Sequence, residues 1–341
     1  MSEQQNYTRK DFASDQEVKW CPGCGDYSIL ASIQSVCAKL GHKKEDVCFI
    51  SGIGCSSRLP YYMNTYGMHT IHGRAIAVAS GLKIHNPKLS VWVATGDGDA
   101  MSIGGNHFIH AIRRNIGLKI VIFNNEIYGL TKGQYSPTSR QGLVTKSSPY
   151  GTIERPFSAA ALAIGSGATF FARTIDSDPK HMQDILLRAH QHRGMAIVEV
   201  LQNCVIFNDG AHSIFTDKTL RDETTMRIEH GKAMIFGTKQ NKGIRLTAGS
   251  DPNPEVVTLG EDGISSKDLL VHDERKQSTF LANLLTTFNQ PTHPLPLGVF
   301  RAIERETYEE CLEAQTQLIA SHRKERSMQD LLLSGETWMI D

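Results

Sequence analysis

One stretch of the chain, residues 95–134, constrains the fold more than any other: TGDGDAMSIGGNHFIHAIRRNIGLKIVIFNNEIYGLTKGQ. Two apolar runs, 89–94 and 118–123, lie on either side of a segment, 103–116, whose apolar residues recur at helical spacing. A strand, a glycine turn, a helix and a second strand form the βαβ unit of parallel sheets, in which ligands bind at the carboxyl ends of the strands. The stretch therefore predicts an open α/β fold with its site at these strand ends.

Polar residues follow both apolar runs. Gly96-Asp97-Gly98-Asp99 comes after the first run, and Asn125 comes directly after Asn124 at the end of the second. Glycines let backbone N–H groups approach a phosphate, and the start of a helix adds a positive dipole end. A carboxylate, an amide oxygen and a nearby backbone carbonyl are ligands that Mg²⁺ accepts. A generic nucleotide site is the alternative, although the chain lacks a G-x-G-x-x-G turn that opens a first βαβ unit.

These motifs resemble a known family. The Gly-Asp-Gly and Asn-Asn pair at this spacing resembles the diphosphate-binding signature of thiamine diphosphate enzymes. The continuation IYGLTKGQ at 127–134, followed by Ser136-Pro137-Thr138, resembles the β subunit of 2-oxoacid:ferredoxin oxidoreductases, and the resemblance extends over residues 18–208. It implies a sheet of the thiamine diphosphate-binding type, with Asp97, Asn125 and the carbonyl of Ile127 on Mg²⁺. It also implies that the cofactor is bound by Gly54, Cys55, Ser56, His72, Gly73, Arg74, Gly96, Gly98, Asp99, Gly129 and Leu130.

Composition excludes several classes of function. The 341 residues include 36 basic and 36 acidic ones, and this balance argues against nucleic acid as a partner. No window approaches the ~20 apolar residues of a membrane helix. The N-terminus is polar and has no secretory signal, so we expect a cytoplasmic protein. Seven cysteines without an export signal predict metal or redox ligands rather than disulfides.

We expect three parts along the chain. Residues 1–19 form a polar arm that wraps a partner, and 20–230 form the α/β domain, a doubly wound, mostly parallel sheet. Residues 231–341 form an elaboration that packs on the core or on another subunit, with a proline-rich linker at 291–296. Asp26 is the expected N-cap of the first helix of the domain.

Four cysteines lie in loops at expected strand ends. Cys21 and Cys24 form a C-x-x-C pair, Cys55 lies in the next glycine turn, and Cys204 follows the last strand of the domain. The spacing is compatible with zinc, with a 4Fe–4S cluster or, for the C-x-x-C alone, with a thioredoxin-like redox pair. The resemblance implies a 4Fe–4S cluster on all four. We expect the remaining cysteines to be packing residues, namely Cys37, Cys48 and Cys311.

The resemblance implies oxidative decarboxylation of a 2-oxo acid, with coenzyme A as acyl acceptor and ferredoxin as electron acceptor, or the reverse carboxylation. The pyrimidine-binding half of the site, with its glutamate, would belong to an α subunit in an αβ or (αβ)₂ complex. Arg58 and Lys132 are cations placed to bind substrate carboxylates, and the lysine favours 2-oxoglutarate over pyruvate. The alternatives are a pyruvate-specific homologue, a non-redox decarboxylase or carboligase subunit with structural zinc, and a zinc-bound scaffold without activity.

Overall fold

An eight-stranded sheet forms the centre of the computed structural model, which describes residues 6–250, 252–322 and 327–340. The strand order is β2-β1-β3-β4-β8-β7-β13-β9. All neighbouring pairs are parallel except β13 and β7. The sheet confirms the predicted open, mostly parallel α/β fold. Its strands are β1 (Val47–Ser51), β2 (Tyr66–His69), β3 (Ser90–Gly96), β4 (Leu118–Asn124), β7 (Phe170–Ile175), β8 (Ala196–Leu201), β9 (Thr225–Ile228) and β13 (Leu295–Ala302).

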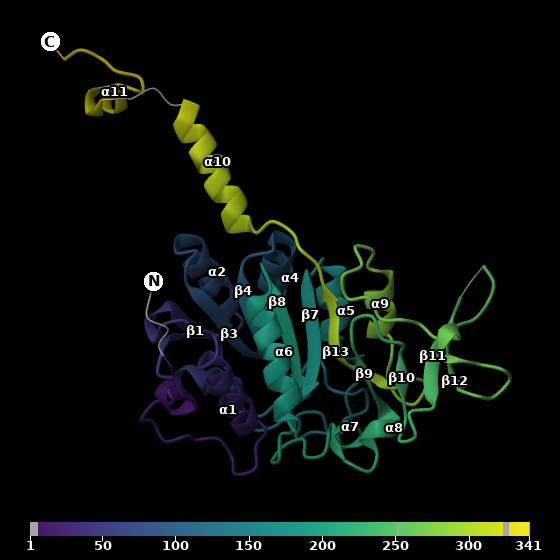
Figure 1. The fold of residues 1–341 in the computed structure, drawn as a ribbon. Helices are drawn as coiled ribbons and strands as arrows, with labels where there is room; N and C mark the ends of the chain where they lie inside the picture. The colour runs from purple at the N-terminus through teal and green to yellow at the C-terminus, as the bar shows by residue number, and fades with distance from the viewer. Residues whose placement is uncertain (1–5, 251, 323–326, 341) are drawn as a thin grey trace.

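Helices cover both faces of this sheet (Figure 1). On one face lie α1 (Asp26–Cys37) and α6 (Pro179–Gln191); on the other lie α2 (Ala75–His85), α4 (Gly105–Arg114), α5 (Ala159–Gly165) and α9 (Phe280–Thr286). Successive strand residues point to opposite faces, so β3 places Val91 and Val93 in one apolar cluster and Trp92 in the other. Burial on both faces explains why the strands are nearly continuous apolar runs.

The central βαβ unit contains two helices where the sequence predicts one. The short helix α3 (Asp97–Met101) follows β3 directly, and the chain turns at Ser102 before α4 begins. At Gly104 a Cβ atom would lie 2.4 Å from the carbonyl oxygen of Asp99, so only glycine fits at this turn. The prediction of a single helix over 103–116 was therefore wrong at its start.

The predicted cap of the first helix was also wrong. Helix α1 begins at Asp26, with Gly25 as its N-cap residue. The Asp26 carboxyl group is 1% exposed, neither of its oxygens meets a nitrogen or oxygen donor among the described residues, and burial raises its pKa to about 7. The group is enclosed beside the Cys21–Cys24 loop rather than placed at the exposed end of the helix.

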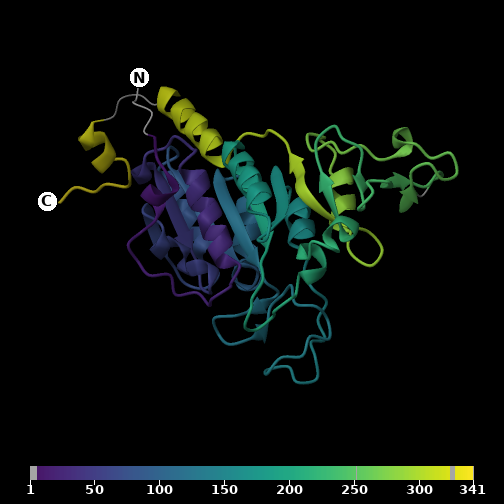
Figure 2. The ribbon, with the colours of Figure 1, turned by 60° about the horizontal axis from the view of Figure 1, so that its bottom comes forward.

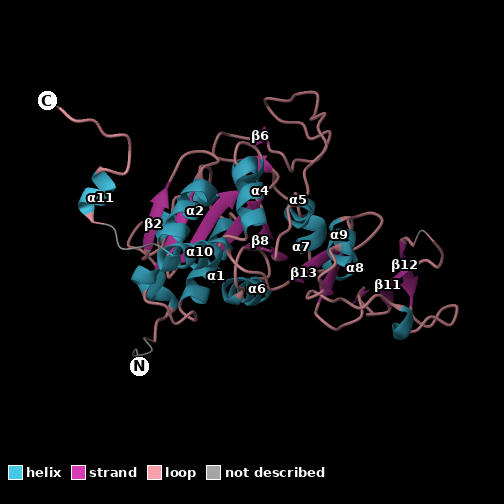
Figure 3. Cartoon of the chain, turned by 90° about the horizontal axis from the view of Figure 1, so that it is seen from above, coloured by secondary structure: helices cyan, strands magenta, loops and turns pink. Residues whose placement is uncertain are grey.

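The C-terminal part of the chain contributes to the central sheet. Strand β13 lies between β7 and β9, and Leu295 and Leu297 are buried. The predicted linker at 291–296 was therefore wrong over its last two residues, which belong to β13. A small sheet of β10 (Ile235–Phe236), β11 (Lys242–Leu246) and β12 (Pro254–Thr258) lies at one end of the molecule (Figure 3). The domain boundaries remain predictions.

The N-terminal and C-terminal ends of the chain differ from each other, because the first packs on the core and the second projects from it. Residues 1–5 of the predicted arm lie outside the described residues, and Phe12, in the 3₁₀ turn η1 (Arg9–Phe12), is fully buried against this chain's own core. Helix α10 (Tyr308–His322) projects from the body and is followed by α11 (Met328–Leu332) (Figure 1). Within the described part of the chain, no helix is both long and apolar enough to cross a membrane.

The long connection from β4 to α5 extends beyond one end of the sheet (Figure 2). It contains the two-stranded hairpin of β5 (Ile127–Tyr128) and β6 (Gln134–Tyr135). The remaining short elements are η2 (Lys44–Asp46), η3 (Ser56–Tyr62), η4 (Ser266–Asp268), α7 (Ser213–Thr216) and α8 (Arg221–Thr224).

Candidate active site

A cavity of about 170 Å³ opens where β1, β3 and β4 end. Parallel strands bring their carboxyl ends to one edge of the sheet, which places the two glycine turns and the Asn124-Asn125 pair together. The cavity is lined by every residue predicted to bind the cofactor except Gly73 and Arg74. Tyr128 forms one wall close to Gly98, where a Cβ atom would lie 2.2 Å from the tyrosine ring.

Asp97 is one of two buried acids that line this cavity. Its side chain is 2% exposed, and its Oδ2 accepts hydrogen bonds from the hydroxyls of Ser136, at 2.5 Å, and Thr138, at 2.6 Å. Burial raises the pKa of the carboxyl to about 6. Among the described residues, no basic side chain forms an ion pair with Asp97, so a bound cation would supply the missing counter-charge.

Asn125 also lines this cavity. Its Oδ1 accepts a hydrogen bond from the backbone N–H of Ile127 at 3.1 Å, and its Nδ2 donates to Gln202 Oε1 at 2.9 Å. The amide oxygen keeps a second lone pair for a metal. Glu126, between Asn125 and Ile127 in the sequence, has a φ of 57°, in the left-handed region, which tightens the turn. The carboxylate, the amide oxygen and a backbone carbonyl fit the oxygen-ligand chemistry of Mg²⁺.

Asp99 also lines the cavity, but both of its carboxylate oxygens accept hydrogen bonds from the protein. Its Oδ1 accepts hydrogen bonds from the N–H groups of Ile53, at 3.1 Å, and Gly73, at 2.8 Å, and from His72 Nδ1 at 2.6 Å. Its Oδ2 accepts one from Thr95 at 2.8 Å. Asp99 thereby joins the two loops after β1 and β2 to the end of β3, and it acts by positioning His72.

Gly73 and Arg74 stand outside the cavity lining. A Cβ atom at Gly73 would lie 2.5 Å from the side chain of Ile103, so this glycine allows α2 to approach the turn before α4. The guanidinium of Arg74 lies 3.2 Å from His107 Nε2 and is directed toward α4. Both residues contact the segment around α4 and do not line the cavity.

All four predicted cluster cysteines line one adjoining cavity of about 240 Å³. It shares Cys55, Asn125, Gly129 and Leu130 with the Asp97 cavity. Desolvation raises the pKa of the Cys24 thiol and raises that of Cys55 to about 12. Within the described part of the chain, no three His, Cys, Asp or Glu side chains are grouped tightly enough to hold one metal ion. Thiols distributed around a cavity fit a multi-atom cluster that fills it.

The other three cysteines follow the prediction only in part. Cys37 and Cys48 are buried in the two apolar clusters. Cys311 is exposed on α10, so the prediction that it packs in the core was wrong. The helix projects from the body, which the local sequence pattern does not reveal.

Comparison with known proteins agrees with this geometry. Residues 52–200 match the family described as thiamine pyrophosphate enzyme, C-terminal TPP binding domain. The subunit KorB of 2-oxoglutarate oxidoreductase from Mycobacterium tuberculosis is 48% identical over 97% of this chain and 88% of its own length. The chain belongs to the β subunits of the 2-oxoacid:ferredoxin oxidoreductases.

Two further relatives support the assignment. The β subunit of 2-oxoacid:ferredoxin oxidoreductase 1 from Aeropyrum pernix is 47% identical over 60% of this chain and 63% of that protein. A solved 2-oxoglutarate:ferredoxin oxidoreductase from Magnetococcus marinus, with 2-oxoglutarate, coenzyme A and succinyl-CoA bound, superposes with a TM-score of 0.78. Its sequence is 31% identical, and the match covers 98% of both chains.

In this β subunit, Arg58 and Lys132 line the cysteine cavity rather than the Asp97 cavity. Arg58 Nε donates to the hydroxyl of Tyr62 at 3.0 Å. Lys132 is exposed and has a φ of 78°, a conformation that favours glycine. A lysine here costs on the order of 1 kcal/mol, and such strain is characteristic of functional positions.

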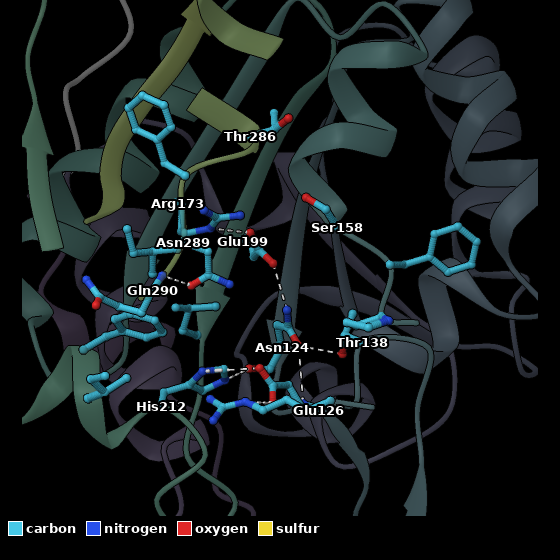
Figure 4. A pocket seen from close by; sticks show the side chains of 18 of the residues that line it. Asn124, Glu126, Thr138, Ser158, Arg173, Glu199, His212, Thr286, Asn289 and Gln290 are labelled. Carbon is cyan, nitrogen blue, oxygen red and sulfur yellow. Dashed lines mark hydrogen bonds and ion pairs between the residues drawn. The ribbon is translucent and has the colours of Figure 1, made fainter. Parts of the chain in front are cut away.

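A larger cavity of about 490 Å³ in the β subunit was missed by the sequence analysis (Figure 4). A buried ion pair lies on its wall, with Arg173 Nε 2.7 Å from Glu199 Oε2. Each of these charges interrupts an apolar strand, FFARTI and AIVEVL. A single charge within a buried strand is the sequence signal that could have identified the pair, because buried charges require partners.

Proposed function

We propose that this chain is the β subunit of a 2-oxoglutarate:ferredoxin oxidoreductase. With an α subunit it would convert 2-oxoglutarate and coenzyme A to the acyl-CoA and CO₂, and pass the electrons through a 4Fe–4S cluster to ferredoxin. The same groups allow the reverse carboxylation. The observation that supports this proposal best is the contiguity of the two cavities, because a thiamine site beside a cluster suits one-electron transfer.

The residues of this chain have distinct roles in the proposal. Asp97, Asn125 and the carbonyl of Ile127 hold Mg²⁺, and the N–H groups of the Gly96–Asp99 turn face the diphosphate. When bound, thiamine diphosphate supplies the nucleophilic carbon and the electron sink for decarboxylation. His72 Nδ1 lies 2.6 Å from Asp99 Oδ1, and this contact holds the imidazole at the cavity. Cys21, Cys24, Cys55 and Cys204 hold the cluster.

The α subunit completes the site. Thiamine chemistry in this class needs a glutamate against the aminopyrimidine ring, and none of the described residues that line the Asp97 cavity is a glutamate. The relatives are named as β subunits, which supports an αβ or (αβ)₂ assembly. The β subunit alone is then inactive. A cytoplasmic location belongs to the same proposal.

The substrate assignment rests on two observations. The Mycobacterium relative is named for 2-oxoglutarate, and the Magnetococcus structure contains 2-oxoglutarate with coenzyme A and succinyl-CoA. Lys132 has a strained backbone conformation at the cysteine cavity, where its ammonium could pair with the second carboxylate of 2-oxoglutarate.

The test uses the αβ complex purified without oxygen. We expect a brown protein whose broad visible absorption bleaches with dithionite, and coenzyme A-dependent reduction of ferredoxin that is fastest with 2-oxoglutarate in a panel of 2-oxo acids. A colourless zinc protein that releases CO₂ without reducing ferredoxin would instead support the non-redox decarboxylase or carboligase. Faster turnover of pyruvate would support the pyruvate-specific homologue.

A further inference from the structure

The Ser136-Pro137-Thr138 motif has no role in the function proposed above, yet it contacts the site. The Thr138 hydroxyl is 2.6 Å from Asp97 Oδ2, and the Ser136 hydroxyl is 2.5 Å from the same oxygen. Both residues are buried, at 5% and 2% exposure. Two hydroxyls from a distant loop thus hold one oxygen of the acid that we assign to Mg²⁺.

The arrangement distinguishes the two carboxylate oxygens. Oδ2 accepts both hydroxyls, whereas no described side chain forms a hydrogen bond with Oδ1. The backbone N–H groups of Asp97 and Gly98 also donate to this carboxylate, and Oδ1 is the oxygen that no side-chain donor occupies. Hydroxyl donors to an ionised carboxylate form short, strong hydrogen bonds, so they fix the rotation of the group about its Cβ–Cγ bond.

The Thr138 hydroxyl adjoins a buried chain of side chains (Figure 4). Its oxygen lies 3.0 Å from Asn124 Oδ1, and Asn124 Nδ2 donates to Glu199 Oε1 at 2.8 Å. Glu199 Oε2 accepts from Arg173 Nε at 2.7 Å. The bond to Glu199 prevents the Asn124 amide from flipping, because a reversed amide would place two oxygens together. The Thr138 hydroxyl has one proton and two neighbouring acceptors, and the shorter distance and the negative charge favour Asp97, so the 3.0 Å approach to Asn124 Oδ1 carries no second donated hydrogen bond.

We propose that Thr138, assisted by Ser136, is a positioning residue for the metal site. It orients Asp97 so that Oδ1 faces the diphosphate cavity before Mg²⁺ binds. Mg²⁺ demands near-ideal octahedral geometry, so a carboxylate held in advance raises metal affinity. This inference rests on the proposed function, in which Asp97 is a magnesium ligand.

The test measures magnesium dependence rather than activity alone. The αβ complex is freed of cofactor, and thiamine diphosphate binding is followed by calorimetry at a series of Mg²⁺ concentrations. We expect Thr138→Val to raise the Mg²⁺ concentration for half-maximal binding by about 10- to 100-fold, as for other outer ligand partners. Thr138→Ser keeps the hydroxyl and should restore nearly wild-type dependence. Excess Mg²⁺ should restore cofactor binding in the valine variant.

Controls separate the possible outcomes. Thr145→Val makes the same chemical change on the same loop, where the hydroxyl faces Ser147, and should leave the magnesium dependence unchanged. An unchanged dependence in Thr138→Val would overturn the inference, as would a loss of binding that excess Mg²⁺ does not restore. Ser136→Ala gives a second test if the valine variant does not fold. An Asp97→Asn complex with wild-type magnesium dependence would instead refute Asp97 as a ligand.

Discussion

His72 is held by Asp99, with 2.6 Å between the imidazole Nδ1 and the carboxylate Oδ1. The same oxygen accepts the backbone N–H groups of Ile53 and Gly73. The two acids of the Gly-Asp-Gly-Asp turn therefore have different tasks. We propose Asp97 as the cation ligand, whereas Asp99 fastens the loops after β1 and β2.

This division predicts opposite results for two similar substitutions. Asp99→Ala removes the acceptor of several buried donors, so we expect at least about 3 kcal/mol of lost stability and a clearly lower melting temperature of the αβ complex. Asp97→Ala should keep the melting temperature of the cofactor-free complex but abolish binding of thiamine diphosphate and Mg²⁺ in calorimetry. The assignment fails if Asp99→Ala melts like the wild type, or if Asp97→Ala binds the cofactor normally.

The cysteine cavity predicts which thiols bind iron. Changing Cys21, Cys24, Cys55 or Cys204 to Ser should lower the iron and sulfide content of the anaerobic complex, because all four line the same cavity. Cys37→Ser and Cys311→Ser are the matched controls, one buried and one exposed, and should retain full iron content. A complete cluster in the Cys204 variant would show that another residue is the fourth ligand.

Lys132 should determine substrate preference. Lys132→Ala should lower kcat/KM for 2-oxoglutarate by roughly 1.5–3 kcal/mol in transition-state stabilisation, as for loss of one hydrogen bond to a charged group, with a much smaller effect on pyruvate.

The backbone supplies a sharper variant at this position. Because Lys132 has a φ of 78°, Lys132→Gly removes the charge and the strain together. We expect the same loss on 2-oxoglutarate as with alanine, together with a melting temperature at or above that of the wild type. An equal loss on pyruvate would indicate that Lys132 serves the cofactor or the shared carboxylate.

Acid stability should depend on His212. This histidine is 3% exposed, and burial lowers its pKa to about 4, whereas an unfolded histidine titrates near 6.5. Between these values the unfolded chain binds the extra proton, so stability is lost as the pH falls from about 6.5 to about 4. The loss attributable to this group reaches about 3 kcal/mol.

The neighbouring Glu126 has the opposite effect on stability at acid pH. Burial raises the pKa of its carboxyl to about 7 from an ordinary value of 4.5, so the folded chain binds the proton first and is stabilised as the pH falls through that window. We therefore expect His212→Gln to reduce the drop in melting temperature of the αβ complex between pH 7 and pH 5. A drop as large as that of the wild type would contradict the assignment.

Local sequence determined much of the site. Gly96–Asp99, Asn125 and the cysteines are identifiable because each follows an apolar strand run or occupies a glycine turn, and parallel strands bring such ends to one edge. These patterns are short and depend on contacts within a few residues. The helix–strand alternation over 20–205 followed from the same local periodicity.

Only the tertiary structure showed which polar groups meet. Thr138 reaches Asp97 across 41 residues of sequence, and Asn124 reaches Glu199 across 75. Strand β13 enters the core sheet from the C-terminal part of the chain, antiparallel to β7. Such contacts depend on how distant segments pack, and no local spacing encodes them. The sequence thus determined which residue types stand at the strand ends, whereas packing decided that Asp97 accepts two hydroxyls from a distant loop and Asp99 holds the loops after β1 and β2.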